Sequence, residues 1–475
     1  ASTIAMTAYG KFGDLIGRKG LLIIAILLFV AGSVVGGLAE NMTWLIIGRA
    51  IQGLGGGGLI ILAQAIIADV VPARERGRYM GVMGGVFAFS SVAGPLLGGW
   101  FTEGPGWRWA FWINLPLGAV ALLAAVFLLR LPANSNVRPR IDYLGMILLS
   151  IGTTCLVLVG SWGGSEYAWT SPVILNLTGA TVLTAVLFVL VERRAAEPIM
   201  PLHLFRDRNF NLTTVAGLII GVAMFGAIAY LPTYFQMVTG VSAAASGLLM
   251  VPMMGGVLTT SILSGQYVSR TGRYKWVTVA SPVVVAVALT LLSTMSATTP
   301  LWLICAYLVI MGIGLGPGMQ LFVLIVQNSF PISQVGTATA ANNFFRQIGA
   351  TLGSGVVGSI FATRLIDLLS KRLPAGAAAN AGGVESLTPE FVNGLPDALR
   401  QAIVTSYNDA LAPIFLYVVP LTLLATVLLL LVKEKPLATT IERDQPFRSS
   451  GETAKADEED DHHGAERVGA TGLTR

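Results

Sequence analysis

The sequence has few charged residues, few histidines and few cysteines. Charged side chains make up only 12% of its 475 residues, about half the share found in an ordinary soluble domain. A cytosolic enzyme is therefore excluded. The two cysteines, Cys155 and Cys305, lie inside apolar runs, and the three histidines, His203, His462 and His463, are scattered. These positions exclude a disulfide framework and a metal site built from Cys or His.

Apolar residues are abundant instead. They make up 54% of the chain, and its mean hydropathy is +0.72, which excludes disorder for most of the length. A helix needs about 20 apolar residues to cross a bilayer, and runs of this kind follow one another between short polar breaks. The sequence therefore predicts an all-α polytopic membrane protein with complete spans at 21–39, 44–68, 80–101, 110–130, 144–162, 172–191, 211–231, 244–264, 276–296, 301–325, 338–362 and 411–432.

Residues 1–9 have the character of the end of a further span, but they are too few to cross the hydrocarbon. The chain also begins with Ala rather than Met. We therefore expect this chain to be a fragment of a longer protein.

The basic residues predict the orientation. If residues 10–20 are cytoplasmic and each span changes side, most of the 30 Lys and Arg residues fall in cytoplasmic loops or in the tail. This distribution satisfies the positive-inside rule. We expect a multi-pass protein of a cell membrane, namely the cytoplasmic membrane of a bacterium.

A weak internal repeat divides the chain. The segment YGKFGDLIGRK at 9–19 matches SGQYVSRTGRY at 264–274 in a glycine, an aromatic residue and a Gly-Arg pair at equal spacing. Repeated halves are common in transporters. Because the two copies are eight spans apart, we expect two additional helices, at 144–162 and 172–191, between two six-helix halves.

Four motifs resemble those of one family. Gly10-Lys11-Phe12-Gly13-Asp14, continued by Gly17-Arg18-Lys19, is similar to the loop between the second and third helices of the major facilitator superfamily. Residues 48–55 resemble its fourth-helix motif, and Gly94-Pro95-Leu96-Leu97-Gly98-Gly99 resembles the fifth-helix motif of its antiporters. WRWAFWINLP at 107–116 is similar to the start of the sixth helix in the fourteen-helix drug/proton antiporter branch, and two inserted spans agree with that branch.

The resemblance implies a major facilitator fold in which the first helix and most of the second are absent from this chain. We expect an incomplete N-terminal bundle at 1–133, two inserted helices with flanking loops at 134–205 and a C-terminal bundle at 206–432. A long outer loop at 363–410 would contain a short surface helix from Pro389 to Ala410, and 433–475 would be a disordered cytoplasmic tail. In the family, the absent first helix carries an Asp associated with proton coupling. Here the acidic residues fall in loops, at span ends or in the tail.

Arg49 is the most unusual single residue, because a charge within a span costs about 3 kcal/mol or more. We expect it to face the bundle interior and to pair there. The resemblance implies a part in proton relay. The alternative is a structural arginine that binds backbone carbonyls or extends to the membrane surface.

Further site residues follow from depth and residue type. The resemblance implies a conformational gate at Gly10, Gly13, Asp14, Gly17, Arg18 and Lys19 and an antiporter motif at Gly94, Pro95, Gly98 and Gly99, for which pure packing is the alternative. Asn343 and Arg346 belong to a polar helix face that either lines a cavity or joins two helices. The candidate substrate-cavity residues are Gln64, Phe87, Phe89, Tyr230, Gln236, Tyr307, Gln320, Asn343 and Arg346.

No GxSxG, HExxH or P-loop motif is present, so an enzyme is not expected. The resemblance implies export of lipophilic, often cationic compounds or drugs in exchange for protons, by alternating access, with no cofactor other than the proton gradient. The partners would be lipophilic small molecules, protons and the lipid bilayer, without nucleic acid or metal, and the protein would be a monomer. The alternatives are an exporter of an endogenous lipid, siderophore or antibiotic, and a transport-inactive fragment or sensor.

Overall fold

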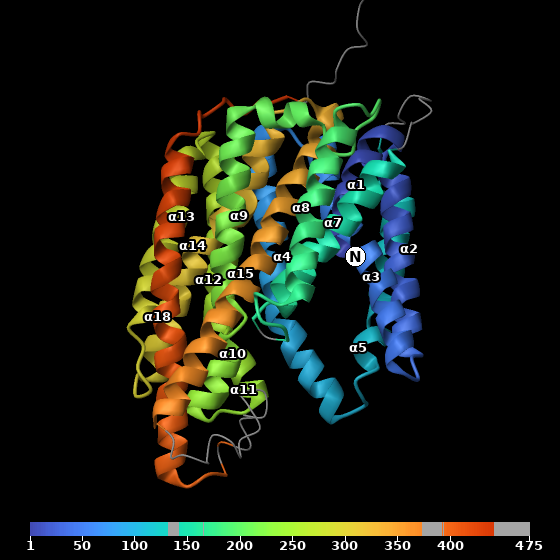
Figure 1. The fold of residues 1–475 in the computed structure, drawn as a ribbon. Helices are drawn as coiled ribbons and strands as arrows, with labels where there is room; N and C mark the ends of the chain where they lie inside the picture. Colours follow the sequence, from blue (N-terminus) through green and yellow to red (C-terminus); the bar gives the residue numbers. More distant parts are fainter. Residues whose placement is uncertain (132–141, 165, 373–391, 393, 441–475) are drawn as a thin grey trace, which may run out of the picture.

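A computed structural model describes residues 1–131, 142–164, 166–372, 392 and 394–440, apart from the side chains of residues 95, 102, 103, 227, 243 and 244. Within these ranges, 12 helical segments are long and apolar enough to cross a membrane. The only bridge between extended residues there joins Gly163 and Tyr167. The predicted all-α polytopic architecture is confirmed (Figure 1).

The first half of the structure contains α1 to η1. Its elements are α1 (Ser2–Ile16), α2 (Arg18–Gly37), α3 (Met42–Val70), α4 (Ala73–Glu103), α5 (Trp109–Trp112), α6 (Asn114–Leu123) and the π-helix η1 (Ala124–Leu128). Asn41 caps α3 by accepting a hydrogen bond from the Trp44 amide, which satisfies one of the free N–H groups of the first turn. The predicted loop at 10–20 is wrong, because all of these residues except Gly17 are helical. Gly17 has a φ of 98°, which interrupts the helix between α1 and α2.

The two inserted helices form a hairpin, α7 (Tyr143–Trp162) and α8 (Pro172–Glu192), capped by Asp142 and Ser171. The hairpin packs on α15 (Val335–Arg372) of the second half. Gly160 and Gly355 bring the backbones of α7 and α15 together, since a Cβ on Gly355 would overlap the Gly160 backbone. The Trp169 indole donates a hydrogen bond of 2.7 Å to the Ser359 hydroxyl. The predicted pair of additional helices is thus attached mainly to the second half.

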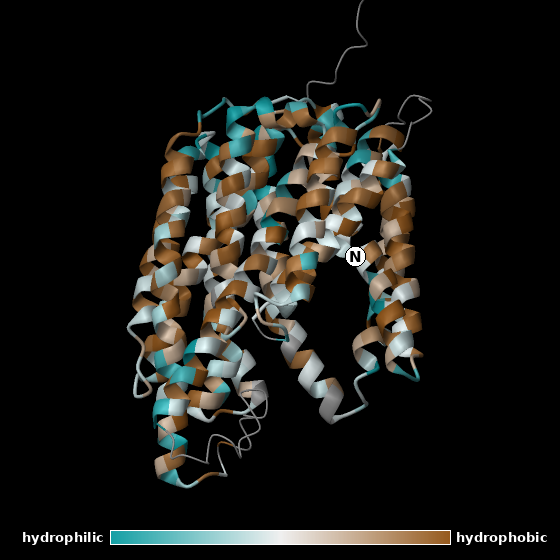
Figure 2. Ribbon diagram, in the orientation of Figure 1, coloured by the Kyte–Doolittle hydropathy of each residue, from teal (hydrophilic) through white to brown (hydrophobic). Residues whose placement is uncertain are grey.

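The second half holds the largest apolar core. Its elements are η2 (Leu202–Arg206), α9 (Arg208–Ile228), α10 (Leu231–Tyr234), η3 (Phe235–Thr239), α11 (Ala243–Leu248), α12 (Val251–Thr271), α13 (Lys275–Ser293), α14 (Leu301–Gln327), η4 (Ile332–Gln334), α15 and α18 (Asp397–Leu430). Large side chains such as Tyr234, Phe322 and Phe415 are completely buried in it. Hydrophobic residues occur along most of the length of the helices (Figure 2), and many large apolar side chains among them are exposed, as contact with lipid requires.

Two predicted boundaries in this half are wrong. The helix α15 continues to Arg372, and α18 begins at Asp397, so the outer loop is shorter than 363–410. The predicted surface helix from Pro389 to Ala410 is not separate, because its described part from Asp397 onward is the first part of α18; Pro389 lies outside the described residues. Hydropathy could not show this, since these helices extend with polar residues beyond their apolar portions.

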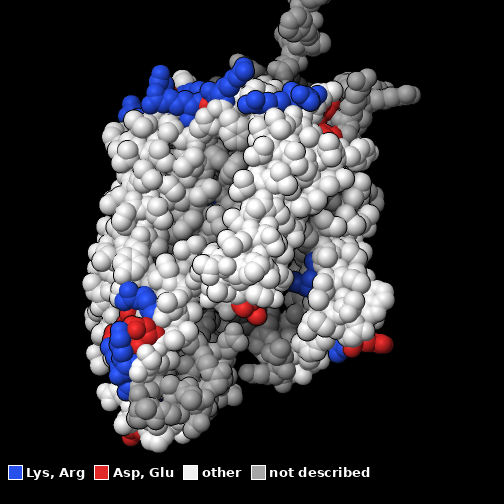
Figure 3. All heavy atoms as spheres, viewed as in Figure 1, with Lys and Arg blue, Asp and Glu red and all other residues white. Residues whose placement is uncertain are grey.

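Lys and Arg side chains gather at one end of the bundle (Figure 3). We call this the basic end; it holds residues 10–20, 72–76, 193–207, 272–275 and 432–440. The arrangement agrees with the predicted cytoplasmic side. A second charged group lies at the far end, where Arg372 pairs with Asp409 at 2.6 Å.

Residues 433–440 form a C-terminal strap across the basic end. The Lys433 amide and carbonyl bind the Asn209 side chain at 2.9 and 2.8 Å, and Glu434 accepts the Tyr274 amide at 2.7 Å. The Arg74 amide at the start of α4 donates to the Ala438 carbonyl at 3.0 Å. The prediction of disorder from 433 is therefore wrong for 433–440, and the remainder, including His462 and His463, lies outside the described residues.

Glycines allow the backbones of α12 and α14 to approach closely. Larger side chains at these glycines should therefore lower the stability of the fold. A Cβ on Gly312 would contact the Met253 carbonyl and lie 3.0 Å from the Val257 nitrogen, whereas a Cβ on Gly255 would meet nothing within 4 Å. We expect Gly312→Val to lower stability by about 1–3 kcal/mol through overpacking, and Gly255→Val to have little effect. Thermal unfolding of the two detergent-purified variants tests this, and equal melting temperatures would contradict it.

Candidate functional site

Asp14 joins the two halves at the basic end. Its carboxylate accepts the Gly336 amide at 3.1 Å, the Thr337 amide at 2.7 Å and the Thr337 hydroxyl at 2.8 Å. Both amides belong to the first turn of α15, where N–H groups lack helical partners and the helix dipole favours an anion. Asp14 of the first half therefore caps a helix of the second half.

Arg18 holds Asp14 in place. Its guanidinium donates to Asp14 at 2.7 Å and also pairs with Asp69 at the end of α3. It further donates to the Ala65 carbonyl at 2.8 Å and to the Ile332 carbonyl of η4 at 3.1 Å. The side chains of Arg18 and Asp14 are only 5% and 4% exposed. Removing one partner of such a buried pair costs about 3–5 kcal/mol.

The glycines of the same motif allow the close approach. A Cβ on Gly10 would overlap Ala340 and lie 2.7 Å from the Gly336 carbonyl of α15. A Cβ on Gly13 would lie 3.2 Å from Leu62 and 3.3 Å from Arg18, and Gly17 forms the turn at positive φ. Gly10, Gly13 and Gly17 thus give α1 its contact surface. We call Asp14, Arg18, Asp69, Gly336 and Thr337 the interdomain gate.

The two lysines of the motif lie at the rim of this gate. Lys19 donates to the Val126 carbonyl at 2.9 Å, and Lys11 pairs with Glu197, in the turn after α8, at 2.8 Å. Burial raises the pKa of the Asp14 carboxyl above its usual value, while Arg18 and Thr337 oppose this rise. The charge of Asp14 therefore depends on its partners.

The helix α4 touches the second half through one part of its length. A Cβ on Gly77, Gly81 or Gly84 would lie 2.6–3.1 Å from atoms of α12, such as the Ser261 carbonyl. Farther from the basic end, a Cβ on Gly94, Gly98 or Gly99 would meet nothing within 4 Å. The predicted antiporter motif thus lies where α4 has left α12, and the side chain of its Pro95 lies outside the described residues.

A cavity of about 320 Å³ lies between the two halves. The first half contributes Met6 of α1, Ile60 and Gln64 of α3, and four residues of α4. The second half contributes residues of α9, α14 and α15. The complete lining is Met6, Ile60, Gln64, Met83, Val86, Phe87, Ser90, Ile220, Gly221, Met224, Phe225, Gly318, Met319, Gln320, Phe322, Asn343, Arg346 and Gln347. We call it the central cavity.

Its polar groups form a chain across the halves. The Asn343 amide donates to Gln64 at 3.0 Å, and Arg346 donates to Asn343 at 2.5 Å and to the Met319 carbonyl at 3.3 Å. No carboxylate of the described residues forms an ion pair with Arg346. The remaining walls are mainly apolar and rich in methionine, whose flexible side chain adapts to guests of different shape.

The structure brings only some of the predicted cavity residues together. Gln64, Phe87, Gln320, Asn343 and Arg346 line the central cavity. Gln236 lines an adjoining pocket of about 330 Å³ that shares Phe87, Met224 and Phe225 with it.

The structure does not place the other three predicted residues at the central cavity. Phe89 is 70% exposed, Tyr230 donates its hydroxyl to the Ser354 carbonyl at 2.8 Å, and Tyr307 packs against the core of the second half. A contact of these three residues with substrate stays a prediction. None of them is among the residues that line the central cavity in the described structure, since hydropathy gives the depth of a residue but not the rotation of its helix.

Arg49 does not have the predicted environment. Its side chain is exposed, and its guanidinium donates to Gln52 at 2.6 Å. Gln52 is buried and donates to Ser33 of α2 at 2.9 Å. The expectation that Arg49 is enclosed by the bundle is therefore wrong for the described structure, and its part in proton relay stays a prediction.

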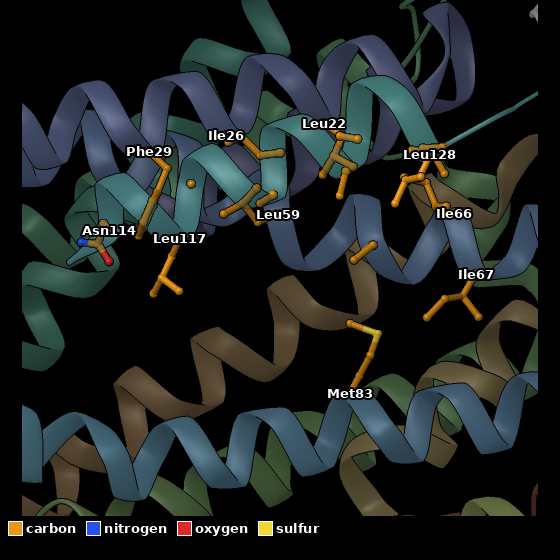
Figure 4. Close-up of a pocket in the computed structure, with 16 residues that line it drawn as sticks. Leu22, Ile26, Phe29, Leu59, Ile66, Ile67, Met83, Asn114, Leu117 and Leu128 are labelled. Atoms are coloured by element: carbon orange, nitrogen blue, oxygen red, sulfur yellow. The ribbon is translucent and has the colours of Figure 1, made fainter. Parts of the chain in front are cut away.

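A second, more apolar pocket of about 740 Å³ lies within the first half (Figure 4). Leu22, Ile26 and Phe29 of α2 face Leu59 and Ile66 of α3. Met83 of α4, Leu117 of α6 and Leu128 of η1 complete the labelled wall. Asn114 is the polar member of this lining, and its amide donates to Ser33 at 3.2 Å. Such walls suit an apolar molecule or an apolar helix.

Sequence reasoning missed important members of both sites. Asp69, Gly336 and Thr337 complete the gate, but they lie far from Asp14 in the chain and carry no local motif. Met83, Met224 and Met319 line the central cavity; the only signal in the sequence was that each lies within a predicted span.

Similarity to known proteins agrees with this geometry. The sequence pattern of the Major Facilitator Superfamily matches residues 1–354. An uncharacterized MFS-type transporter of Mycobacterium tuberculosis is 41% identical over 92% of this chain. The matched region covers 63% of that relative's own length. The multidrug transporter protein MdtP of Bacillus subtilis is 35% identical over 87% of the chain and 78% of its own length.

A third relative and a solved structure extend the comparison. Multidrug resistance protein 3 of Bacillus subtilis is 32% identical over 92% of the chain and 86% of its own length. The crystal structure of the human organic anion transporter MFSD10 (TETRAN) superposes with a TM-score of 0.58 at 15% identity, over 90% of this chain and 80% of that one. This last similarity shows a shared fold. These matches and the twelve apolar helices identify a multi-pass membrane protein of a transporter family rather than an enzyme, and the chain belongs to the Major Facilitator Superfamily.

Proposed function

We propose that this protein exports lipophilic compounds across a cell membrane in exchange for protons, by alternating access to the central cavity. The central cavity carries the proposal, because its walls come from both halves and the polar chain Gln64–Asn343–Arg346 crosses between them. A relative movement of the two halves would therefore change which residues surround a bound molecule. The hydrogen bonds from Gly336 and Thr337 to Asp14 join the two halves at the basic end, which supports a gate at this end.

The charge of the cavity bears on the substrate class. Arg346 is the charged residue of the described lining, and it is a cation. A buried unpaired cation repels a second cation and attracts an anion. The described lining thus favours neutral or anionic lipophilic compounds, and the cationic drugs implied by the family resemblance would require a carboxylate from elsewhere in the protein.

Exchange for protons is the part of the proposal that rests on the resemblance. The fifth-helix motif supports it, because Gly94, Gly98 and Gly99 lie on the part of α4 that is separated from α12. In the proposed cycle, this part of α4 would move towards the second half when the gate opens.

Vesicles containing the full-length protein test the proposal. A proton gradient should drive uptake of a lipophilic anion into inverted vesicles, and addition of that compound should release protons measurably. Substrate movement that is unchanged when the gradient is collapsed would contradict proton exchange. Failure of neutral, anionic and cationic lipophiles alike to move would favour a sensor that has lost transport.

A further inference from the structure

Two carboxylates meet at the basic end of the inserted hairpin. Asp142 precedes α7, and one of its oxygens, Oδ1, accepts the Gly145 amide at 2.8 Å and so caps the helix. Its other oxygen, Oδ2, is buried and has no hydrogen-bond partner among the described residues. A buried acceptor without a partner is costly, so this oxygen calls for a donor.

Glu192, the last residue of α8, has the same deficiency. It is only 4% exposed. Its Oε1 accepts the amides of Ile199 and Met200 at 3.2 and 3.4 Å, which holds the turn after α8 against the helix end. Its Oε2 is buried, and no residue in the described part of the chain forms a hydrogen bond with it.

The two side chains face the same small space beside Gly145. A Cβ on Gly145 would overlap Oδ2 of Asp142 and would lie 3.2 Å from Oε1 of Glu192. Among the described residues, the other charge that acts on Glu192 is Lys11 of α1, which is already paired with Glu197 at 2.8 Å. The two carboxyl groups therefore lie on the same side of Gly145, and no ion pair among the described residues includes either of them.

A single bound proton would relieve the repulsion between the two carboxyl groups. Two ionised carboxylates close to each other repel, and such pairs retain one proton. The resulting hydroxyl group is a donor, which an ionised carboxyl pair does not have. A metal ion is a poorer occupant, since Oε1 already faces two N–H donors and no group of three metal-binding side chains occurs in the described ranges.

We propose that Asp142 and Glu192 form a carboxyl pair that binds one proton between the ends of α7 and α8. This site is separate from the central cavity and does not rest on the proposed transport function. It has a mechanical connection to the gate, because Glu192 holds the turn that carries Glu197, and Glu197 binds Lys11 of α1. Loss of the proton would leave two negative charges that repel each other, and this repulsion would weaken the contact between Glu192 and that turn.

Infrared spectroscopy of the full-length protein in lipid nanodiscs tests the site directly. The carbonyl stretching band of a neutral carboxylic acid should be present near neutral pH and should disappear as the pH rises. Glu192→Gln should remove the band, because it replaces one of the two carboxyl groups that share the proton with an amide. Asp142→Asn should lower the midpoint of the titration by about one pH unit or more, since it removes a like charge and supplies a donor.

The control is Asp367→Asn, which changes an exposed carboxylate at the far end that pairs with Lys371; it should leave band and midpoint unchanged. Persistence of the band in Glu192→Gln, or an unchanged midpoint in Asp142→Asn, would overturn the proposal. Loss of the band on adding sodium at constant pH would also overturn it, in favour of a metal ion. None of these readouts depends on transport, so failure of the proposed function would leave the band in place.

Discussion

Replacing Asp14 with asparagine is expected to open the basic end of the protein. The substitution removes the charge that binds Arg18 and caps α15, and it turns one acceptor oxygen into a donor that faces the Thr337 amide and hydroxyl. Loss of one partner from a buried ion pair costs about 3–5 kcal/mol. Since each 1.4 kcal/mol is a factor of ten, the closed population should fall by at least a hundredfold relative to the open one.

Spin labels measure this change in the full-length protein. Gly20 at the start of α2 and Ser333 in η4 are exposed positions on opposite sides of the gate. With cysteines at these sites and the native Cys155 and Cys305 replaced by serine, the distance distribution should shift to longer values in Asp14→Asn.

Thr337→Val is the matched control for the gate. It removes one hydroxyl donor to Asp14 and leaves both amides and Arg18 in place. A single hydrogen bond to a charged group is worth about 1.5–3 kcal/mol, so the shift should be smaller than in Asp14→Asn. Identical distance distributions in the Asp14→Asn variant and the parent protein would show that the gate does not hold the halves together.

Replacing Arg346 with methionine is expected to change which compounds the central cavity accepts. Methionine keeps a flexible unbranched side chain but is shorter and lacks the cation that the described lining presents. A hydrogen bond to a charged group contributes about 1.5–3 kcal/mol, or roughly ten- to a hundredfold in affinity. Lipophilic anions should therefore bind at least tenfold more weakly to Arg346→Met, whereas lipophilic cations should bind equally well or more tightly.

Binding of matched fluorescent lipophiles of opposite charge provides the measurement. Lys371→Met, on the same helix but exposed near its far end, removes a cation without touching the cavity and should change neither affinity. Parallel losses for the anion and the cation in Arg346→Met would indicate that Arg346 acts through structure rather than through its charge.

Hydropathy predicted the number and order of the complete spans, because burial in lipid imposes a length that the sequence must display. It failed at helix ends. Gly17 alone separates α1 from α2, and α15 and α18 continue past their apolar portions to Arg372 and from Asp397. In these regions water satisfies the side chains, so polarity no longer marks the end of a helix.

The candidate sites were predictable only where a local motif carried them. The glycines and charges at 10–19 predicted a gate, but the partners Gly336 and Thr337 depend on how α1 meets α15. Phe87 and Phe89 show the same limit at the cavity. They are two residues apart in one helix, and Phe87 lines the cavity whereas Phe89 is 70% exposed. Which of them faces the cavity depends on the rotation of α4, which the sequence does not display.

The C-terminal strap limits how far the two halves can separate at the basic end. Ala438 is bonded to Arg74 of the first half, while Lys433 is bonded to Asn209 of the second. If the contacts of Glu434 and Lys435 release and those two bonds persist, the intervening chain can span about 20 Å at most, at roughly 3.3–3.6 Å per residue. The strap would then act as a tether of fixed length, and a wider separation of the halves would first require it to detach from Arg74.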